Sequence, residues 1–569
     1  MPPAVSALAT RLRLADAARR QSAARVVPVV VLHLAALAIL ATTESDAAAR
    51  VAFLLFWGFL NCCWLVVLRR PAPAAALSFG MIAVLILLSQ FKHSIQFMTV
   101  NFIDLLVIDV DTLAFLFAIF PNLKLWVGLA LAAATPVIAW MFWFDPFRVW
   151  RLSAFAAAAM CLVGLAGVSF AVPTDPYEEF YAHQYVSKFA RSGSTAIADY
   201  ISRGLLEADA KTADRLAFAA DDVCKPIRKP PHIVMVFDES SFDLSIAPGI
   251  QVPADYQRHF RSFDGRARSF IVEGAGGPSW FTEYNVLTGL SARSYGRFAD
   301  FVTRIAATHV ERGLPRALRR CGYKTFSLYP YYGAFLGARR FQTQTGIEHF
   351  VDAKEMGARG IEPDHFFYDA AADVIARERG GAPLFLFTYT AANHFPWSYR
   401  FRPDLAPGWR NLGNDAETDE FLRRQSISAQ DYSDFVERLR RDFPSEQFLI
   451  VRFGDHQPSI ARHLLDPALD DSLLARQIAQ HDQKFLTTYY AIDAVNFQPA
   501  DLSSALDKLD APYLPIVVQE AAGLPLDPSF AEQKKIMQRC AGMFYRCAGG
   551  AEARRFNRLL IDAGLIKGL

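Results

Sequence analysis

The 569-residue chain lacks a charge imbalance: its 59 Lys and Arg residues nearly balance 57 Asp and Glu residues, for a net charge of +2. It also lacks basic stripes interleaved with aromatic residues, so nothing points to nucleic acid binding. Cysteine is scarce, with seven residues and no CxxC pair, which disfavours a zinc knuckle. Hydrophobic residues, by contrast, make up 52% of the chain.

These hydrophobic residues are concentrated in the part of the chain that ends near Val172. A helix needs roughly 17–25 apolar residues to cross a bilayer core. Five stretches are long enough, at about residues 26–43, 51–68, 74–90, 124–143 and 152–171. The first is interpreted as an anchor rather than a cleavable signal peptide, because further spans follow at once and no small-residue cleavage site ends it.

Arginine residues predict the orientation of these spans. They form three groups, with Arg11, Arg13, Arg19, Arg20 and Arg25 before the first span, Arg69 and Arg70 after the second, and Arg148 and Arg151 between the fourth and fifth. All three groups fall on one side if the N-terminus is cytoplasmic. Five crossings then place everything after Val172 in the periplasm, outside a bacterial inner membrane.

The segment between the third and fourth predicted spans is ambiguous. Asp104, Asp109 and Asp111 make it too acidic for a confident span, and its other residues make it too apolar for a plain loop. We interpret it as an amphipathic helix on the outer membrane surface, near residues 101–120. A sixth span is the alternative, and it would place the large domain in the cytoplasm.

The cysteines favour an oxidising compartment for the large domain. Three lie in predicted spans, which leaves an even number in the remaining chain. The short loop from Cys540 to Cys547 is the expected bridge, and Cys224 is then left to pair with Cys321.

Four regions are predicted: a transmembrane anchor at 1–172, a polar helical connector at 173–229, a catalytic domain at 230–510 and a C-terminal extension at 511–569. Within 230–510, apolar strands alternate with amphipathic helices: strands are predicted at 232–240, 324–331, 383–394 and 446–456, and helices at 313–323, 367–380 and 429–443. This alternation predicts an α/β domain with a largely parallel sheet covered on both faces.

Polar pairs follow three of the predicted strands. Asp238-Glu239, Asn393-His394 and Asp455-His456 each come where an apolar run ends. Ligands of such sheets bind beyond the carboxyl ends of the strands, so these residues are expected at one rim.

Glu239, Asp455 and His456 offer carboxylate oxygens and an imidazole nitrogen, a donor set that suits one zinc or manganese ion. A bound dication would lower the pKa of an alcohol, and Ser279 is the candidate alcohol. It follows a glycine-rich turn and begins a predicted helix, where backbone N–H groups favour an anion.

Each of these residues also has a plainer interpretation. Glu239 and Ser279 could cap local turns or helices, Asp455 could belong to an ordinary turn, and His394 and His456 could be satisfied structural histidines. Their joint position at the mouth of one sheet favours the metal site.

The spans together with the strings VFDESS, GGPSWFTEYNVLTG, NHFPW and FGDHQPS resemble the lipoteichoic acid synthase and phosphoglycerol transferase group of the alkaline phosphatase and sulfatase superfamily. The resemblance covers about residues 26–500, and phosphoethanolamine transferases of lipid A are more distantly similar. It implies that Glu239, Asp455 and His456 hold the metal and that the nucleophile also coordinates it.

The resemblance further implies a nucleophile with an acid four positions later, which fits Ser279 with Glu283 but not Thr282. It implies that His394 contacts the substrate phosphate or aids the leaving group. The family arginine matches Arg339 or Arg340 only with a shift of one or two positions. Trp397 is a candidate wall of the head-group pocket.

The expected function is transfer of phosphoglycerol from a phospholipid, such as phosphatidylglycerol, to an envelope glycan through a phospho-serine intermediate. Phosphoethanolamine transfer from phosphatidylethanolamine to lipid A or a glycan is one alternative. A metal-dependent phosphodiesterase or phosphatase is another, and a catalytically silent membrane scaffold is a third. Sulfate ester hydrolysis is disfavoured, because Ser279 is not followed by the x-Pro-x-Arg string of sulfatases.

Overall fold

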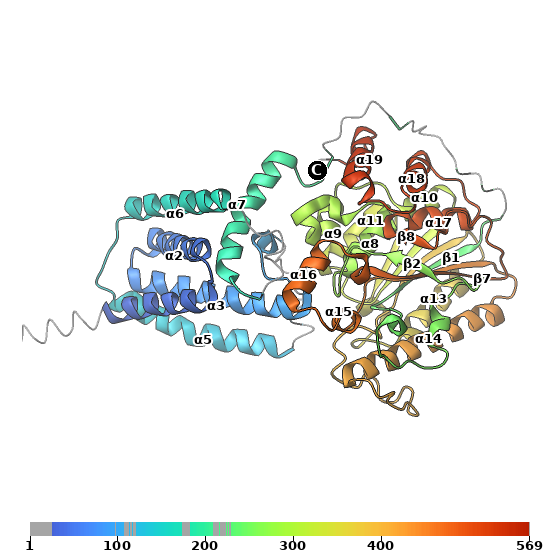
Figure 1. The fold of residues 1–569 in the computed structure, drawn as a ribbon, viewed down its shortest axis with the longest axis horizontal. Helices are drawn as coiled ribbons and strands as arrows, with labels where there is room; N and C mark the ends of the chain where they lie inside the picture. The colour runs from blue at the N-terminus through green and yellow to red at the C-terminus, as the bar shows by residue number, and fades with distance from the viewer. Residues whose placement is uncertain are drawn as a thin grey trace, which may run out of the picture. The chain divides into compact units, whose positions relative to one another are not determined.

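The computed structural model of the chain describes residues 26–96, 98–106, 121–172, 182–208 and 229–567, together with residues 113, 117, 215, 216, 224 and 226. The chain divides into two compact units, Met1–Ile201 and Ser202–Leu569 (Figure 1). The first unit holds apolar helices and the second an eight-stranded, mostly parallel sheet with helices around it. The predicted fold class is therefore confirmed.

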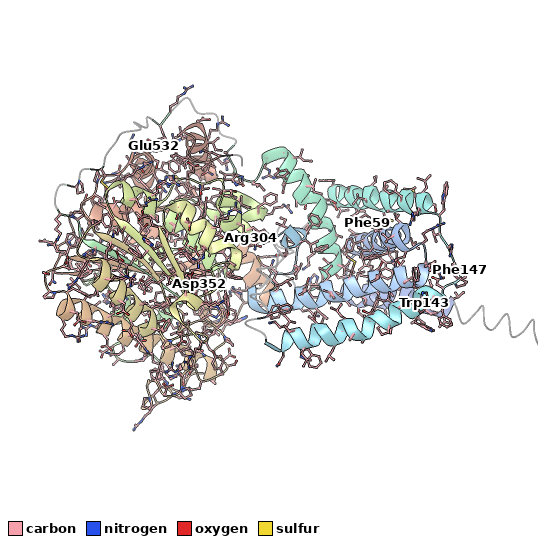
Figure 2. The ribbon with its side chains drawn as sticks, turned by 180° about the vertical axis from the view of Figure 1, so that it is seen from behind. Phe59, Trp143, Phe147, Arg304, Asp352 and Glu532 are labelled. Carbon is pink, nitrogen blue, oxygen red and sulfur yellow. A yellow bond between two sulfur atoms is a disulfide. The ribbon has the colours of Figure 1, made fainter. Side chains whose placement is uncertain are left out.

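Five helices in the first unit are long and apolar enough to cross a membrane. They are Val26–Thr43, α2 (Ala47–Leu68), α3 (Pro71–Gln96), α5 (Pro121–Phe144) and α6 (Arg151–Ala171). Large apolar side chains on them are exposed; Val163 is 72% exposed and Trp143, labelled in Figure 2, is 78% exposed. Exposed apolar surface of this extent is unfavourable in water and is usual where a helix contacts lipid. The five predicted spans are confirmed as helices of this kind.

Two of the predicted arginine groups lie at the same end of this unit. The turn after α2, which carries Arg69 and Arg70, is hydrogen-bonded to the turn between α5 and α6. The N–H of Val149 donates to the carbonyl of Arg69 at 2.9 Å, and the N–H of Ala72 donates to the Asp145 carboxylate at 2.6 Å. Hydrogen bonds join turns only when both are on one side of the bundle, as the predicted orientation requires.

The predicted surface helix near 101–120 lies largely outside the described residues. Within it, Phe102–Leu106 form the short 3-10 helix η1. The N–H of Phe102 donates to the hydroxyl of Ser192 at 2.9 Å, which ties η1 to α7 (Tyr185–Arg203). The helix α7 occupies part of the predicted connector at 173–229.

The second unit is built on a sheet with strand order β4-β3-β5-β1-β6-β7-β2-β8. The strands are β1 (His232–Asp238), β2 (Arg268–Ile271), β3 (Lys324–Tyr329), β4 (His349–Asp352), β5 (Leu384–Tyr389), β6 (Phe448–Gly454), β7 (Thr487–Val495) and β8 (Lys508–Asp510). Only β7 runs antiparallel to its neighbours β6 and β2. The predicted strands are the parallel centre of this sheet, where both faces are buried and the sequence is continuously apolar.

Two amphipathic helices, α13 (Asp364–Glu378) and α14 (Ala416–Asp442), pack on one face of the sheet. Their core contacts include Tyr368, Ile375 and Phe435 against Val234 and Leu386. Figure 1 shows α8 (Ser279–Thr288), α10 (Leu314–Arg320) and α17 (Leu514–Ala521) on the opposite side of the sheet. Helices on both faces leave the strand ends as the place for a site.

Both predicted disulfides are present. Cys224 is bonded to Cys321 with a Cα–Cα distance of 4.8 Å, and Cys540 is bonded to Cys547 at 5.7 Å. The first crosslinks the segment before β1 to the residue that ends α10. Bridges of this kind persist in oxidising compartments, as predicted for this domain.

Candidate metal centre and nucleophile

The register of the central strands brings the predicted polar pairs together. Strand β1 lies between β5 and β6, and Asp238 pairs with Gly454 at the carboxyl end. The next residues, Glu239 and Asp455, therefore leave the sheet side by side. Gly454 is required there, because a Cβ at this position would lie 2.2 Å from the carbonyl oxygen of Ser241.

The ligand atoms of Glu239, Asp455 and His456 all lie within 4.8 Å of one another, and the three side chains are buried. Nε2 of His456 is 3.2 Å from Oδ2 of Asp455 and 3.8 Å from Oε1 of Glu239. Carboxylate and imidazole donors at this spacing can bind one divalent ion. The residues predicted from three separate positions in the sequence thus form one cluster.

The donor atoms are oriented for a cation. Nδ1 of His456 is 2.9 Å from the carbonyl oxygen of Gln457, and a carbonyl only accepts, so Nδ1 carries the proton. Nε2 therefore presents a lone pair to Oδ2 of Asp455, which is buried and accepts no hydrogen bond within the described chain. Two lone pairs in contact repel each other unless a positive ion lies between them. Zinc and manganese both fit this set.

The charge of the cluster also calls for a cation. Burial, and next the charge of Asp455, raise the pKa of Glu239 well above its usual range. Burial raises the pKa of Asp455 as well. Each carboxylate accepts one short hydrogen bond from Ser240, from its hydroxyl to Glu239 at 2.8 Å and from its N–H to Asp455 at 2.7 Å, and Glu239 accepts two long ones, from the hydroxyls of Tyr389 and Ser279 at 3.4 and 3.5 Å. That is too little to hold two buried anions together without a metal.

Ser279 joins this cluster from the first residue of α8. Its Oγ lies 3.2 Å from Nε2 of His456 and 3.5 Å from Oε2 of Glu239. The N-terminal end of a helix stabilises a negative charge, because its N–H groups and dipole point toward it. A serine alkoxide or a bound phosphoryl group would be favoured at this position.

The glycine-rich turn before Ser279 wraps around an arginine that the sequence did not identify. The buried guanidinium of Arg462 donates to the carbonyl of Ala275. Gly276 has φ of +66°, and a Cβ there would lie 2.2 Å from Nη2 of Arg462. The glycine is needed for this close approach, and the turn in turn sets the position of Ser279.

His394 follows β5 and is half-buried beside the cluster. Its Nδ1 is 2.7 Å from the carbonyl oxygen of Phe395, which leaves Nε2 as an acceptor. Burial is the main cause that lowers the pKa of His394 to about 4, and the charge of Arg424 adds to it. A neutral imidazole can accept a proton from an attacking hydroxyl.

Arg424 on α14 holds the His394 loop in place. Its guanidinium donates to the carbonyls of His394, Pro396 and Tyr399 at 2.8, 2.9 and 3.0 Å, and its Nε is 2.9 Å from Oε1 of Glu420. Arg424 is fully buried, so these contacts replace its hydration. The sequence prediction began this helix near residue 429 and missed both residues. The N-cap residue Asp415 is the sequence feature that indicates the true start of this helix.

Asp364 supports the same loop from α13. Its Oδ1 accepts from the N–H groups of Ala391 and Ala392 at 3.1 and 2.9 Å. Burial, and next the charge of Asp238, raise the pKa of Asp364 to about 7. This carboxylate was also missed, because an Asp at the start of a helix is usual.

We expect Asp364→Asn to stabilise the full-length protein at pH 8 and not at pH 4.5. The folded pKa of about 7 exceeds the unfolded value near 3.8, so folding binds a proton and the wild type loses stability as pH rises between them. The wild type loses at most about 4 kcal/mol of unfolding free energy in this way. The asparagine side chain avoids this loss and retains an acceptor oxygen for the loop. Thermal unfolding midpoints at both pH values test this. An equal difference at both would contradict it.

The remaining predicted residues have other contacts. Nη2 of Arg339 lies 3.1 Å from Asp352 and 2.6 Å from Glu355, and Arg340 is exposed. Trp397 is 3% exposed and packs on Phe421 in the core. These contacts give Arg339 and Trp397 structural roles, and a role of Arg339, Arg340 and Trp397 in substrate binding stays a prediction.

Glu283 lies one turn after Ser279 on α8, as its spacing predicted. It is buried, and burial raises its pKa to about 8. The amide of Gln342 donates to its Oε1 at 2.9 Å, which connects α8 to α11 (Ala338–Thr345). Glu283 is therefore a neutral support of the nucleophile helix near pH 7.

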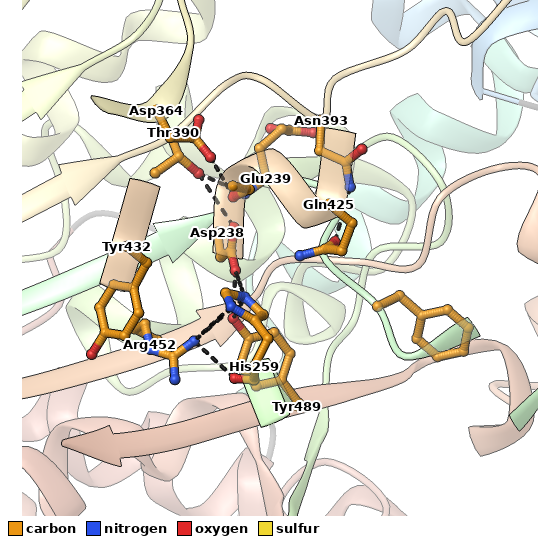
Figure 3. A network of polar contacts seen from close by, with 12 residues as sticks. Asp238, Glu239, His259, Asp364, Thr390, Asn393, Gln425, Tyr432, Arg452 and Tyr489 are labelled. Carbon is orange, nitrogen blue, oxygen red and sulfur yellow. Dashed lines mark hydrogen bonds and ion pairs between the residues drawn. The ribbon is translucent and has the colours of Figure 1, made fainter. Parts of the chain in front are cut away.

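Beneath Glu239, Asp238 belongs to a buried polar network (Figure 3). Its Oδ2 is 2.8 Å from Nε2 of His259 and accepts a hydrogen bond from the hydroxyl of Tyr489. The guanidinium of Arg452 donates to the carbonyl of His259 at 2.9 Å. Burial raises the pKa of Asp238, but the contacts with His259, Tyr489 and Arg452 outweigh it, so the net shift is downward. The network fixes the strand end that carries Glu239.

A family model matches the part of the chain that carries most of this site. Residues 278–497 match the sequence model of the Sulfatase family, a segment that includes Ser279, His394, Asp455 and His456. No curated protein matches the chain.

Several solved structures are similar to the chain. Phosphoglycerol transferase GacH of Streptococcus pyogenes, in complex with sn-glycerol-1-phosphate, aligns with TM-score 0.46 and 14% identity over 60% of this chain and 87% of that chain. Lipoteichoic acid synthase LtaP of Listeria monocytogenes aligns with TM-score 0.41 and 15% identity over 54% and 76%. Lipooligosaccharide phosphoethanolamine transferase EptA of Neisseria meningitidis aligns with TM-score 0.43 and 12% identity over 84% and 96%. The match of residues 278–497 to the Sulfatase family model agrees with the family resemblance predicted from the sequence.

Proposed function

We propose that the chain is a membrane-anchored transferase that moves phosphoglycerol from a phospholipid to a hydroxyl of an envelope glycan through a phospho-serine intermediate. The observation that carries this proposal is the position of Ser279 Oγ at a helix N-terminus, 3.2 Å from Nε2 of His456 and 3.5 Å from Oε2 of Glu239. Glu239, Asp455 and His456 would hold one zinc or manganese ion. When bound, that ion lowers the pKa of the serine hydroxyl and neutralises phosphoryl charge.

In the first step, Oγ of Ser279 attacks the head-group phosphorus of a lipid such as phosphatidylglycerol. The bond from phosphorus to the diacylglycerol oxygen breaks, and that oxygen takes up a proton to give diacylglycerol. In the second step, a glycan hydroxyl attacks the same phosphorus and the bond to Ser279 breaks. The unprotonated Nε2 of His394 would accept the proton of that hydroxyl.

The proposed compartment is the periplasmic side of a bacterial inner membrane. The joined turns of the first unit place two arginine groups at one end of the helices, and cytoplasmic ends carry the excess of arginine. Five crossings then carry the catalytic unit to the other side. The two disulfides support an oxidising location. There, the head groups of outer-leaflet phospholipids are the available donors.

The proposal is tested with the full-length protein reconstituted in liposomes. Head-group-labelled phosphatidylglycerol should yield diacylglycerol and a labelled envelope glycan, and labelled phosphatidylethanolamine should yield neither. Transfer from phosphatidylethanolamine alone would show a phosphoethanolamine transferase. Release of free glycerol phosphate at the same rate with and without glycan would show a hydrolase. Mass spectrometry of glycans and lipid A from a deletion strain provides the cellular counterpart.

A further inference from the structure

The C-terminal end of α8, the helix that begins at Ser279, is held by two side chains, and one of them, Gln533, lies outside the segment 278–497 that matches the Sulfatase family model. Nη1 of Arg312 donates to the carbonyl of Thr288. The amide of Gln533 donates to the carbonyl of Gly289. Nη2 of Arg312 also donates to Oε1 of Gln533 at 2.6 Å. We call Arg312 and Gln533 the α8 clamp.

The C-terminal extension supplies Gln533 to this clamp and packs aromatic rings on Arg312. Gln533 lies on α18 (Pro528–Arg539). The ring of Phe530 on the same helix packs against the Arg312 guanidinium, with its centre 3.8 Å from Cζ. Phe556 on α19 (Ala551–Asp562) lies 5.2 Å from the same guanidinium. Arg312 and Gln533 are fully buried, and burial lowers the pKa of Arg312 to about 10. At neutral pH it remains a cation at the negative end of the helix dipole.

The chain leaves room for this contact at the end of α8. Gly289 has φ of +71° and caps the helix in the left-handed conformation. A Cβ at this position would lie 2.5 Å from Nη1 of Arg312 and 2.9 Å from Oε1 of Gln533. Glycine at position 289 therefore allows Arg312 and Gln533 to bond the backbone carbonyls directly.

We propose that the C-terminal extension acts through the α8 clamp to position Ser279, so that Arg312 and Gln533 are positioning residues for the transfer. This rests on the proposed role of Ser279 as nucleophile. The helix has ten residues and is about 15 Å long. Its first turn is fixed to the metal ligands, since the hydroxyl of Thr282 donates to the carbonyl of Asp455 at 2.6 Å. A small tilt at the clamped end shifts Oγ at the other end, and a misplacement of about 1 Å costs about 100-fold in rate.

The test is Gln533→Glu in the full-length protein, assayed for diacylglycerol release. The carboxylate still accepts from Arg312, but it cannot donate to the carbonyl of Gly289. We expect kcat to fall about 10- to 100-fold with KM and metal content unchanged. Arg312→Lys keeps the cation without the planar fork and should show a smaller loss of the same kind.

Arg555→Met provides the matched control. Arg555 on α19 forms a salt bridge of 2.9 Å with Glu532 on α18, and this bridge does not include α8. This variant loosens the extension and should retain wild-type kcat. An active Gln533→Glu protein, or an equal loss in Arg555→Met, would overturn the clamp. Inactivity of the wild type itself would count against the proposed function instead.

Discussion

Replacing Ser279 with alanine is expected to abolish diacylglycerol release from phosphatidylglycerol, with a loss of at least about 10³-fold. No other hydroxyl has the same combination of contacts in the described chain: Ser279 is the first residue of α8 and its Oγ lies 3.2 Å from His456. Metal content and the thermal unfolding midpoint should stay close to wild type, because the three protein ligands remain. Thin-layer chromatography of labelled lipid measures the release.

Thr282→Val is the matched control for Ser279→Ala. Thr282 also lies on α8, but its hydroxyl donates to the carbonyl of Asp455 and is committed to that bond. The valine variant loses this contact of the first turn of α8 and should lose at most about 100-fold in activity, less than the alanine variant. Undiminished diacylglycerol release by Ser279→Ala would disprove the nucleophile assignment.

Removing the metal is expected to lower both activity and stability, and Glu239→Gln separates the two effects. Glu239→Gln and His456→Ala should each lose most of the metal and at least about 100-fold in activity, since each removes a ligand. With excess chelator, Glu239→Gln should unfold at the same temperature as wild type or higher. The reason is that burial and Asp455 both disfavour the Glu239 charge. Without chelator the wild type should be the more stable protein.

Glu283→Gln controls for the loss of any buried carboxyl group in this region. Glu283 lies on α8 but outside the donor cluster, and its pKa of about 8 leaves it mostly neutral at pH 7. This variant should retain the metal, as measured by elemental analysis. Full metal content in both Glu239→Gln and His456→Ala would show that the cluster is not the metal site.

Four neighbouring parallel strands of the sheet could be predicted from the sequence, and the other four strands could not. Strands β1, β3, β5 and β6 are continuous apolar runs because both their faces are covered, and all four were predicted. The edge strands β4 and β8 have four and three residues, and β2, which lies between β7 and β8, has four, too few to show a period. The antiparallel strand β7 was missed although it is nine residues long.

The cluster of possible metal ligands could be predicted, because the ligand chemistry of its residues and their positions after strands indicate the same site. Glu239, Asp455 and His456 are ligand types that follow predicted parallel strands, and parallel strands end at one edge of the sheet. The supports of the site give no comparable signal. Arg424 and Arg462 bind backbone carbonyls far away in the sequence, and such contacts depend on the tertiary structure.

For Trp397 and Arg339, residue type and position in the sequence do not indicate a single role. An aromatic residue or an arginine near a strand end fits either a substrate pocket or the protein's own packing, and the sequence does not distinguish the two. The indole of Trp397 donates to the carbonyl of Asn393 at 3.1 Å, and Arg339 is bound by two carboxylates. These partners are set by the fold and could not be predicted from the sequence, and the predicted role of both residues in substrate binding stays a prediction.

The most direct test of the central claim is to map the covalent intermediate. The full-length protein would be incubated with phosphatidylglycerol without a glycan acceptor, quenched in acid, digested with trypsin and fragmented in a mass spectrometer. Cleavage after Arg268 and Arg293 gives one peptide that contains Ser279 together with the competing hydroxyls of Ser269, Thr282, Tyr284, Thr288 and Ser291. We predict a phosphoglycerol adduct on Ser279 that is absent from Ser279→Ala. An adduct on another residue, or diacylglycerol release with no adduct at any time point, would contradict the phospho-serine mechanism.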